Sequence, residues 1–585
     1  MLSRLSERCT AATTLERQVL RRHVWSAAWL REAEPAAAAS QDIDLSQLME
    51  RAGRAAYDVF ATLYASQRHW LVVVGPGNNG GDGYVIARHA RAAGKRVTVF
   101  SMPHTKPLPT EAANAQRAWQ AAGGTEAVLD PDVPLQLPGE VDLVVDGLLG
   151  TGIAGPPRAH YEDVIRRLNA LAVPRVAIDI PSGLNAETGE AAGACLRADH
   201  TATFISLKPG LLTGQARSYV GQLHYRSLGL EAWLTAPERV AACQCRRVAV
   251  EDVYDYFGAP RSASAHKGSC GKVVLVGGDH GCGGAILMSA EACLTAGAGL
   301  TRVLTRPEHV TPLLTRCPEV MVVAVGPEPH DDALPLLRRQ MTDAFGWATT
   351  VAVGPGIGTG AYGRAAVAAA LRHGAAHPDA TIVLDADALN LLAERIRGKD
   401  QAATAGGADV EEKEESAPLP TLRNSIITPH PGEAARLLCC SVAAVEQDRL
   451  AAARRLASIL GGTCLLKGPG TVVHDCSSGR TAIVDAGNAG MASGGMGDVL
   501  TGLVAGLAAQ QMRDTFDITC ASALAHGVAA DMVAADAGRG TRGIRATELI
   551  QRFPFILNAS RAASSATPHP QPEQEPQQPQ PCSGL

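Results

Sequence analysis

A glycine-rich segment that follows an apolar run constrains the fold of this chain more than any other feature. Residues 75–83 read Gly-Pro-Gly-Asn-Asn-Gly-Gly-Asp-Gly, directly after the apolar run 71–74 and directly before the helix-like stretch 84–88. In a glycine-rich turn between a strand and a helix, bare backbone N–H groups converge and bind anions. The sequence therefore predicts a strand–turn–helix unit of a parallel sheet that handles a phosphorylated ligand.

The same segment matches a dinucleotide-binding fingerprint only superficially. Gly75, Gly77 and Gly80 fit G-x-G-x-x-G, but a match of this kind is weak on its own. A dehydrogenase places an Asp or Glu about 20 residues further on to bind the ribose. Here the next strand-like run, 96–100, is followed by Ser-Met-Pro with no acid. The turn also carries side chains that a backbone cradle does not need: Asn78, Asn79 and Asp82.

Length and the alternation of segments indicate two domains. A chain of 585 residues exceeds the size at which one hydrophobic core keeps growing. Strand-like runs alternate with alanine-rich helical stretches over residues 25–230, and again from the run 272–278 to residue 556. This is the rhythm of parallel sheets between helix layers. We therefore predict an α/β protein with two three-layer αβα domains, the N-terminal one Rossmann-like.

Composition places the boundaries of these domains. A polar stretch at residues 235–255 lacks a strand pattern and separates the halves. Residues 398–418 are acidic and read as a solvated loop, and the Pro- and Gln-rich tail cannot bury enough apolar surface to order itself. We predict a flexible N-terminus at 1–22, a first domain at 23–235, a second domain at 250–558 and a disordered tail at 559–585.

Charge, aromatic content and cysteine spacing argue against several classes of function. A formal net charge of -5 and 4% aromatic residues disfavour a nucleic-acid-binding surface. The longest apolar run, 499–509, is shorter than the roughly 20 residues that a membrane helix needs and is broken by glycine. The 14 cysteines lack zinc-finger spacing. We expect a cytoplasmic homo-oligomer that binds no nucleic acid and no membrane.

Two carboxylates follow strand-like runs of the first half. Asp146 opens a second glycine-rich loop, 147–156, and Asp179 precedes Ile-Pro-Ser-Gly-Leu. An aspartate at a strand end is on its own more often a helix cap than a catalyst. Ligands of parallel sheets bind outside the carboxyl ends of the strands, so these loops should converge with residues 78–82. Their convergence predicts a binding site.

These residues resemble the YjeF N-terminal family, the NAD(P)H-hydrate epimerases. The resemblance covers residues 25–230, including 48–53 (Leu-Met-Glu-Arg-Ala-Gly) and 204–210 (Phe-Ile-Ser-Leu-Lys-Pro-Gly). It implies that Asp179 contacts the substrate as acid or base. It also implies a potassium ion held by Asn79, Asp146 and Ser182. The implied binding residues for the hydrated cofactor are Asn78, Asn79, Gly80, Gly81, Asp82, Gly150, Thr151, Gly152, Ile153, Ala154, Gly155, Pro156 and Asp179.

The implied substrate is a reduced nicotinamide cofactor that has added water at C6 of its ring. Interconversion of its R and S forms needs proton transfer around that carbon, which a carboxylate near a fixed cation can supply. We hypothesise that Asp179 assists loss and re-addition of the hydroxyl through an iminium-like state.

The strongest pattern of the second half is a glycine-rich run that meets the start of a helix. Residues 485–498 read Asp-Ala-Gly-Asn-Ala-Gly-Met-Ala-Ser-Gly-Gly-Met-Gly-Asp and precede the helix-like stretch 499–503. Such a run forms an anion hole for a transferring phosphoryl group, and Asp498 beside it can take a proton from the attacking hydroxyl. The pattern is typical of phosphoryl transfer, without a Walker lysine.

Further segments of the second half strengthen this interpretation: 354–358 (Gly-Pro-Gly-Ile-Gly), 384–390 (Leu-Asp-Ala-Asp-Ala-Leu-Asn), 428–433 (Thr-Pro-His-Pro-Gly-Glu) and 465–471 (Leu-Leu-Lys-Gly-Pro-Gly-Thr). Residues 266–548 resemble the ribokinase-like family, and within it the NAD(P)H-hydrate dehydratases. The implied contacts of the hydrate are Ala285, Gly356, His430 and Asp498. The implied holders of an adenine nucleotide, with Mg²⁺ at its phosphates, are Lys467, Gly468, Pro469, Gly470, Thr471 and Gly497.

The implied reaction is phosphorylation of the hydrate hydroxyl by ADP or ATP, with Asp498 as base, and then elimination of phosphate. Met496 stands where many ribokinase-like kinases have Ser or Thr, which leaves the choice of nucleotide open. Three accounts compete. In the first, the chain is a bifunctional repair enzyme whose first half converts the R hydrate and whose second half consumes the S form. In the second, it is a small-molecule kinase of the vitamin or sugar type. In the third, it is a binding scaffold.

Overall fold

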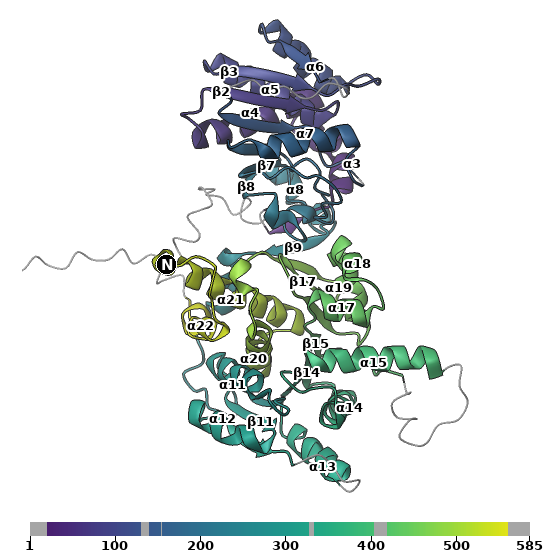
Figure 1. Cartoon of the computed structure of the whole chain (residues 1–585), viewed down its shortest axis with the longest axis vertical. Coiled ribbons are helices and arrows are strands. Elements are labelled where there is room, and N and C mark those ends of the chain that lie inside the picture. Colours follow the sequence, from purple (N-terminus) through teal and green to yellow (C-terminus); the bar gives the residue numbers. More distant parts are fainter. Residues whose placement is uncertain are drawn as a thin grey trace, which may run out of the picture.

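The computed structural model describes residue 20 and residues 22–129, 140–153, 155–326, 333–402 and 418–559. Two α/β bodies are stacked along the long axis of the molecule, with the first half above the second in Figure 1. Their sheets have seven and eleven strands. The predicted α/β class with two parallel-sheet halves is confirmed.

The first sheet is parallel throughout, in the order β4-β3-β2-β5-β6-β7-β8. Its strands are β2 (His69–Val74), β3 (Arg96–Ser101), β4 (Glu126–Val128), β5 (Leu143–Gly147), β6 (Arg175–Ile178), β7 (His200–Phe204) and β8 (Gln222–Arg226). The helices of this half are α3 (Ala27–Ala39), α4 (Leu45–Leu63), α5 (Asn78–Ala92), α6 (Thr110–Ala121), α7 (Ala159–Ala170), α8 (Glu231–Leu234) and α9 (Pro237–Val240), with 3-10 turns η1 (Pro209–Leu211) and η2 (Ala216–Ser218). Strands β2 and β3 occur at the predicted runs 71–74 and 96–100.

Helices cover both faces of this sheet. Val72 and Val74 pack in one core cluster with Phe60 of α4, whereas Leu71 and Val73 pack in another cluster that includes α7. Every residue of β2 is buried. Because successive side chains of a strand point to opposite faces, a strand covered on both faces is apolar along nearly its whole length, as β2 is from residue 70 to residue 74.

The second sheet has the order β1-β9-β18-β17-β16-β15-β14-β13-β10-β11-β12, with antiparallel pairing only along β1–β9 and β16–β17–β18. Its strands are β1 (His23–Val24), β9 (Cys245–Val248), β10 (Lys272–Val276), β11 (Leu300–Thr305), β12 (Met321–Ala324), β13 (Thr350–Val353), β14 (Thr381–Leu384), β15 (Ser425–Ile427), β16 (Thr463–Leu466), β17 (Thr471–Asp475) and β18 (Thr481–Val484). The main helices are α10 (Val253–Phe257), α11 (Gly283–Thr295), α12 (Val310–Arg316), α13 (Ala333–Phe345), α14 (Ala361–Ala376), α15 (Asp387–Ala402), α17 (Pro431–Leu437), α18 (Val442–Gln447), α19 (Arg449–Ser458), α20 (Met496–Ala509), α21 (Thr515–Ala535), α22 (Ala546–Ile550) and α23 (Phe553–Leu557).

This sheet too lies between two helix layers. Val274 and Val351 share a core cluster with α14, α15 and α19, whereas Val273 and Ala352 share one with α11, α20 and α21. The first of these clusters continues into the first half through Leu211 and other residues of segment 180–220. The two halves therefore pack against each other through apolar contacts and are not joined by a linker alone.

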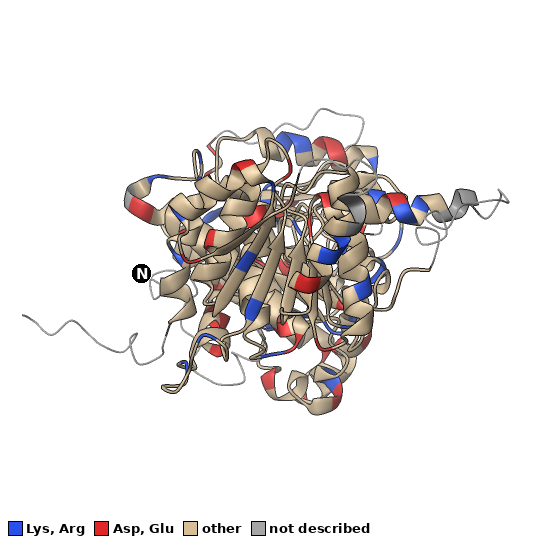
Figure 2. Cartoon of the chain, turned by 90° about the horizontal axis from the view of Figure 1, so that it is seen from below, with Lys and Arg blue, Asp and Glu red and all other residues tan. Residues whose placement is uncertain are grey.

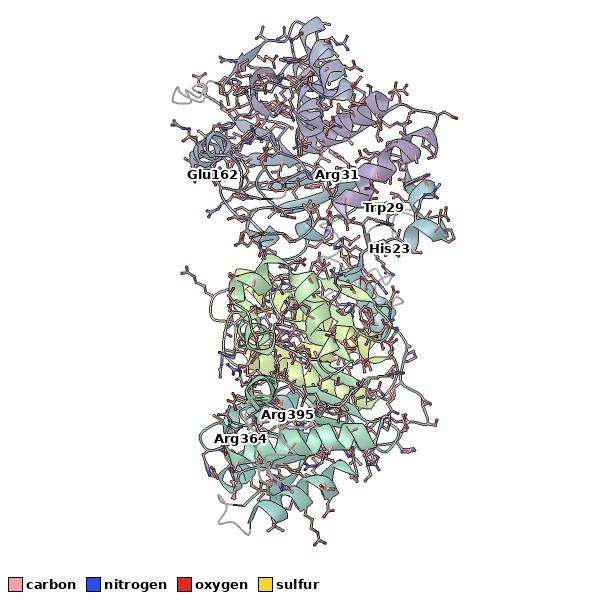
Figure 3. The ribbon with its side chains drawn as sticks, turned by 90° about the vertical axis from the view of Figure 1, so that its right-hand side faces the viewer. His23, Trp29, Arg31, Glu162, Arg364 and Arg395 are labelled. Atoms are coloured by element: carbon pink, nitrogen blue, oxygen red, sulfur yellow. The ribbon has the colours of Figure 1, made fainter. Side chains whose placement is uncertain are left out.

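The prediction that residues 235–255 lack a strand is wrong, because β9 lies there and belongs to the second sheet. Its polar appearance comes from Arg246 and Arg247, which form ion pairs with Asp252 and Asp485. Strand β1 pairs with β9, so a strand from the start of the first half completes the second sheet. Figure 3 shows His23 of β1 at the junction of the two halves.

Helix α21 corrects the prediction that residues 499–509 form the longest apolar stretch. Among the described residues it is the one helix that is long and apolar enough to cross a membrane, and 83% of its apolar window is buried inside the protein. Asp517 and Asp531 interrupt its sequence, so the sequence shows no long uninterrupted apolar run there. A core helix packed on all sides passes the same test of length and composition.

Charged residues of both signs are interspersed over the ribbon when the molecule is seen from below in Figure 2. The prediction of a loop at 398–418 is wrong for residues 398–402, which extend helix α15, because polar and charged residues continue a solvated helix. Residues 1–19 and 21, the stretch 403–417 and the tail from 560 onward lie outside the described residues, as do the predictions made for them.

Candidate active sites

The first glycine-rich turn brings the main chains of two neighbouring strands close together. A Cβ atom at Gly75 would lie 1.8 Å from the carbonyl oxygen of Leu148, and one at Gly80 would lie 2.0 Å from the carbonyl oxygen of Gly75. A side chain at either position would collide with main chain. Because β5 pairs with β2, this close approach sets the start of α5 against the loop after β5.

Three side chains that the sequence assigns to a potassium ion meet at this point. Ser182 donates two hydrogen bonds to Asp146, from Oγ at 2.6 Å and from its amide at 2.8 Å. Asn79 Nδ2 donates to the carbonyl of Leu149 at 3.0 Å, and the Leu149 amide donates to Ser182 Oγ at 2.9 Å. Asn79 Oδ1 is buried without a hydrogen-bond partner among the described residues. An orphaned amide oxygen beside a buried carboxylate suits a hard cation.

The electrostatics of Asp146 agree with this fit. Burial raises the pKa of Asp146 to about 6, although hydrogen bonds from Ser182 and Leu148 favour the charged form. A carboxylate at 0% exposure is costly to ionise without a counter-charge. The site therefore favours a positive charge next to it.

Asp179 follows β6 in a strained backbone conformation, with a φ of 61°. Its Oδ1 atom accepts hydrogen bonds from Thr203 Oγ1 at 3.0 Å and from the Phe204 amide at 3.2 Å, and it forms an ion pair with Lys208. Lys208 Nζ also donates to Thr203 Oγ1 and to the Phe204 carbonyl, both at 3.0 Å. A left-handed backbone at a residue other than glycine, fixed by its surroundings, is typical of functional sites.

Two further carboxyl groups lie within electrostatic reach of Asp179. Burial raises the pKa of Asp82 well above its usual value, and the charge of Asp179 raises it further. Burial and then Asp179 also raise the pKa of Glu34 on α3. The crevice thus places two carboxyl groups of raised pKa beside the contact between Asp179 and Lys208, a grouping typical of sites for acid–base chemistry.

The second glycine-rich loop lies against the same crevice. A Cβ atom at Gly150 would lie 3.2 Å from Asn79 Cβ. The Thr151 carbonyl accepts a hydrogen bond at 3.0 Å from Arg31 of α3, which Figure 3 labels. The other predicted binding residues are exposed (Asn78, Gly152, Gly155, Pro156), half-buried (Ile153) or buried (Gly80, Gly81), and Ala154 lies outside the described residues.

In the second half, α20 begins at the end of the glycine-rich run, as predicted. Gly495, the residue before the helix, has a φ of 87°. Asp498 lies in the first turn, and its carbonyl accepts a hydrogen bond from Ser289 of α11 at 2.8 Å. The first amides of a helix have no partner within it and attract an anion.

An ammonium group lies beside this helix start. Lys467, which follows β16, places Nζ 2.8 Å from Asp385 Oδ1 and 3.8 Å from Glu433 Oε2. A Cβ atom at Gly497 would lie 3.4 Å from the same Nζ. Thr501 of α20 donates to Asp385 Oδ2 at 2.6 Å. The sequence contains no Walker motif, yet the fold supplies a lysine to the anion hole from a different strand.

The charges of this cluster shift pKa values in opposite directions. Burial raises the pKa of Asp498 to about 6, and the charge of Asp385 adds to the rise. Burial likewise raises the pKa of Glu433 to about 7. Burial would raise the pKa of Asp385 too, but the Lys467 ammonium and hydrogen bonds from Lys467 and Thr501 hold it below its usual value. Asp498 is therefore suited to accept a proton near neutral pH.

The four residues predicted to contact the hydrate surround this cluster. Gly356 packs on α11, where a Cβ atom would lie 3.1 Å from Ala285 Cβ. The next turn of α11 carries the serine that bonds to the Asp498 carbonyl. His430 is the N-cap of α17, with Nε2 3.4 Å from Glu433 Oε1. The fold thus places Ala285, Gly356 and Asp498 at one edge and joins His430 to it through Glu433.

The loop predicted to hold the nucleotide joins β16 to β17. Gly468 and Gly470 have φ values of 140° and 64°, and Thr471 Oγ1 donates to the Gly468 carbonyl at 3.1 Å. Pro469 lies between the two glycines. Because Lys467 at the start of the loop lies beside Gly497, the predicted nucleotide residues come together.

Comparison with known proteins finds a matching family for each half of the chain. Residues 45–210 match the family described as YjeF-related protein N-terminus, and residues 273–554 match the family described as NAD(P)H-hydrate dehydratase. The bifunctional NAD(P)H-hydrate repair enzyme of Leishmania braziliensis is 75% identical over 97% of this chain and 100% of its own length. The protein of that name from Escherichia coli K12 is 46% identical over 92% of this chain and 94% of its own length. This chain belongs to the bifunctional NAD(P)H-hydrate repair enzyme family.

Membership in this family confirms the predicted combination of a hydrate epimerase half and a hydrate dehydratase half. It decides against the vitamin- or sugar-type kinase and against the scaffold. A Bacillus subtilis structure, described as an ADP/ATP-dependent NAD(P)H-hydrate dehydratase co-crystallized with ATP/Mg2+, is 24% identical over 52% of this chain and 95% of that chain, with a TM-score of 0.41. A similarity at that level transfers no ligand to this chain.

Sequence reasoning missed Glu34, Lys208 and the position of Lys467. Lys208 and Lys467 each lie in a segment quoted for its family pattern, and a lysine directly before proline or glycine in the loop after a strand was the available signal. Glu34 lies in an alanine-rich helix, and its sequence neighbours do not distinguish it from an ordinary solvent-exposed glutamate.

Proposed function

We propose that Asp179 and Lys208 carry out the epimerisation, and that Asp498 and Lys467 carry out a nucleotide-dependent dehydration. The observation that supports this most is that each half gathers a carboxylate, a lysine and a glycine-rich loop at the carboxyl ends of its strands. Sheets of this class bind their ligands at that edge.

In the epimerase half, three donors reach Asp179 Oδ1, which leaves Oδ2 to face the substrate. In its protonated form, this carboxyl group gives its proton to the C6 hydroxyl, which then leaves as water. The return of a water to the other face of the ring restores the proton to the same oxygen. Lys208 fixes the orientation of the carboxyl group throughout.

In the dehydratase half, Asp498 takes the proton of the hydrate hydroxyl while that oxygen attacks the terminal phosphorus of the nucleotide. The amides at the start of α20 and the Lys467 ammonium stabilise the charge on the transferred group. ADP becomes AMP, or ATP becomes ADP. Elimination of inorganic phosphate from the phosphorylated hydrate then restores the ring double bond.

The donor sets decide which metals fit. Asn79, Asp146 and Ser182 fit a potassium ion, which would supply a fixed positive charge beside the epimerase pocket. No cluster of three or more His, Cys, Asp or Glu side chains that could cage a metal occurs in the part of the chain that the structure describes. Magnesium would therefore be held largely by the nucleotide phosphates. Homo-oligomer formation and a cytoplasmic location stay predictions.

The stoichiometry of the dehydratase tests this proposal. With ADP and the S hydrate, the protein should form one AMP and one inorganic phosphate for each NAD(P)H regenerated. Asp498→Asn should lose all three products together. Regeneration of NAD(P)H without nucleotide breakdown would overturn the proposal.

A further inference from the structure

The first half touches the proposed nucleotide loop of the second half directly. Residues 209–218 contain turns η1 and η2 and follow Lys208 of the epimerase pocket. A Cβ atom at Gly470 would lie 2.0 Å from the carbonyl oxygen of Leu212. Arg217 Nη1 donates at 2.5 Å to the carbonyl of Gly487, in the glycine-rich run before α20. Two phosphate-binding segments of the dehydratase half therefore lie against one segment of the epimerase half.

The hydroxyl of Thr213 forms the central contact of this interface. Thr213 is 0% exposed. Its Oγ1 atom donates to the carbonyl of Gly470 at 2.7 Å and lies 3.4 Å from that of Pro469. It accepts a hydrogen bond from Arg449 Nε at 3.1 Å. One hydroxyl thus connects the loop to a buried cation.

Arg449 holds the other end of the same loop. Its side chain has 0% exposure and an ion pair to Glu446 at 2.6 Å. Nη2 donates to the carbonyls of Leu466 and Lys467 at 3.2 and 3.0 Å. A planar guanidinium with all its bonds in fixed directions sets the orientation of the peptide groups that it contacts.

We propose that Thr213 and Arg449 are positioning residues for the nucleotide site, so that the epimerase half completes a site whose ligand contacts all lie in the dehydratase half. This inference rests on the proposed nucleotide-binding role of Lys467–Thr471. Loss of the Thr213 hydroxyl leaves the buried Gly470 carbonyl without its donor, and the loop then leaves its bound-like conformation more often. Apparent affinity falls in proportion to the fraction of protein whose loop is competent.

Titration of the full-length protein with ADP tests the proposal. Thr213→Val should raise both the Kd and the KM for ADP on the order of tenfold, as expected for one buried hydrogen bond, without changing kcat at saturating ADP or the epimerase rate. Thr213→Ser should restore the affinity. Thr201→Val is the matched control, because Thr201 is also 0% exposed and its hydroxyl also donates to a carbonyl at 2.7 Å, within the epimerase half. It should bind ADP as the unaltered protein does.

The inference is overturned if Thr213→Val binds ADP normally while Lys467→Met binds it weakly, or if Thr201→Val weakens binding as much as Thr213→Val. If Lys467→Met itself binds ADP normally, the proposed nucleotide site is wrong and the inference falls with it. Hydrogen exchange of the unaltered protein gives a test without substitution. ADP should slow exchange in residues 209–218 as well as in 467–471, and slowing in 467–471 alone overturns the inference.

Discussion

The acid limb of the dehydratase pH profile reports directly on Asp498. A general base works only as a carboxylate, so dehydration should fail as the pH drops through the pKa of Asp498. That pKa is raised from 3.8 to about 6. The profile of kcat/KM at saturating nucleotide should therefore fall off at about pH 6, whereas an ordinary aspartate would sustain the rate to about pH 4.

The causes of the raised pKa predict how a substitution moves this limb. Burial contributes most, the charge of Asp385 next, and the charge of Asp387 adds a smaller rise. Asp387→Asn removes only the smaller contribution of Asp387 to a pKa that is raised by about two units. The acid limb should therefore move to lower pH by less than about one pH unit, which corresponds to about 1.4 kcal/mol of interaction with the ionised form of Asp498. Asp387 accepts bonds from the Gly358 amide and from Asn390 at 3.1 Å each, and an amide oxygen can retain one of them.

The assay is the return of near-ultraviolet absorbance from the S hydrate, measured at a series of pH values. Asp379→Asn is the matched control, because Asp379 is exposed at the opposite end of β14 and should leave the limb in place. An acid limb near pH 4 in the unaltered protein, or no movement in Asp387→Asn, would refute the role of Asp498 as a base with a raised pKa.

Three further predictions concern the epimerase half. Asp179→Asn should abolish epimerisation, as measured by chromatographic separation of the R and S forms. It should bind the hydrate almost as well as the unaltered protein, because Asn tolerates the left-handed φ of 61°. Retained epimerisation would remove the assignment of Asp179. Epimerisation should be slow in potassium-free buffer and recover on adding potassium chloride, and a rate indifferent to the ion would contradict the Asn79 site. Gly80→Ala should lower the free energy of unfolding by about 1–3 kcal/mol in urea, because its Cβ would lie 2.0 Å from a carbonyl oxygen, whereas at Gly77 nothing lies within 4 Å. Equal stability of Gly80→Ala and Gly77→Ala would show that the close approach is not required.

Local patterns predicted most of this architecture, because parallel strands buried on both faces leave continuous apolar runs such as 71–74. The same local logic singled out Asp146, Asp179 and Asp498, since each lies at the end of a strand or in the first turn of a helix beside a glycine-rich loop. What it could not locate were partners from distant segments. Asp385 and Lys467 are paired across 82 positions, and no spacing rule connects them.

Two differences between the predicted and the observed elements, at β9 and at α21, have physical causes of the same kind. The sequence of β9 resembles a polar linker because Arg246 and Arg247 find their counter-charges only in the folded chain. The acidic residues of α21 break its apolar run in the sequence, although the helix packs in the core. The structures of β9 and α21 therefore depend on residues that are distant in the sequence and that pack against them in the fold.

The most direct test of two cooperating sites is the yield of repaired cofactor from a mixture of R and S hydrates with ADP. Complete return of near-ultraviolet absorbance is expected for the unaltered protein, and return of only the S share for Asp179→Asn. If the unaltered protein also restores only the S share, the N-terminal site does not epimerise the hydrate, and the account of a two-site repair enzyme is contradicted.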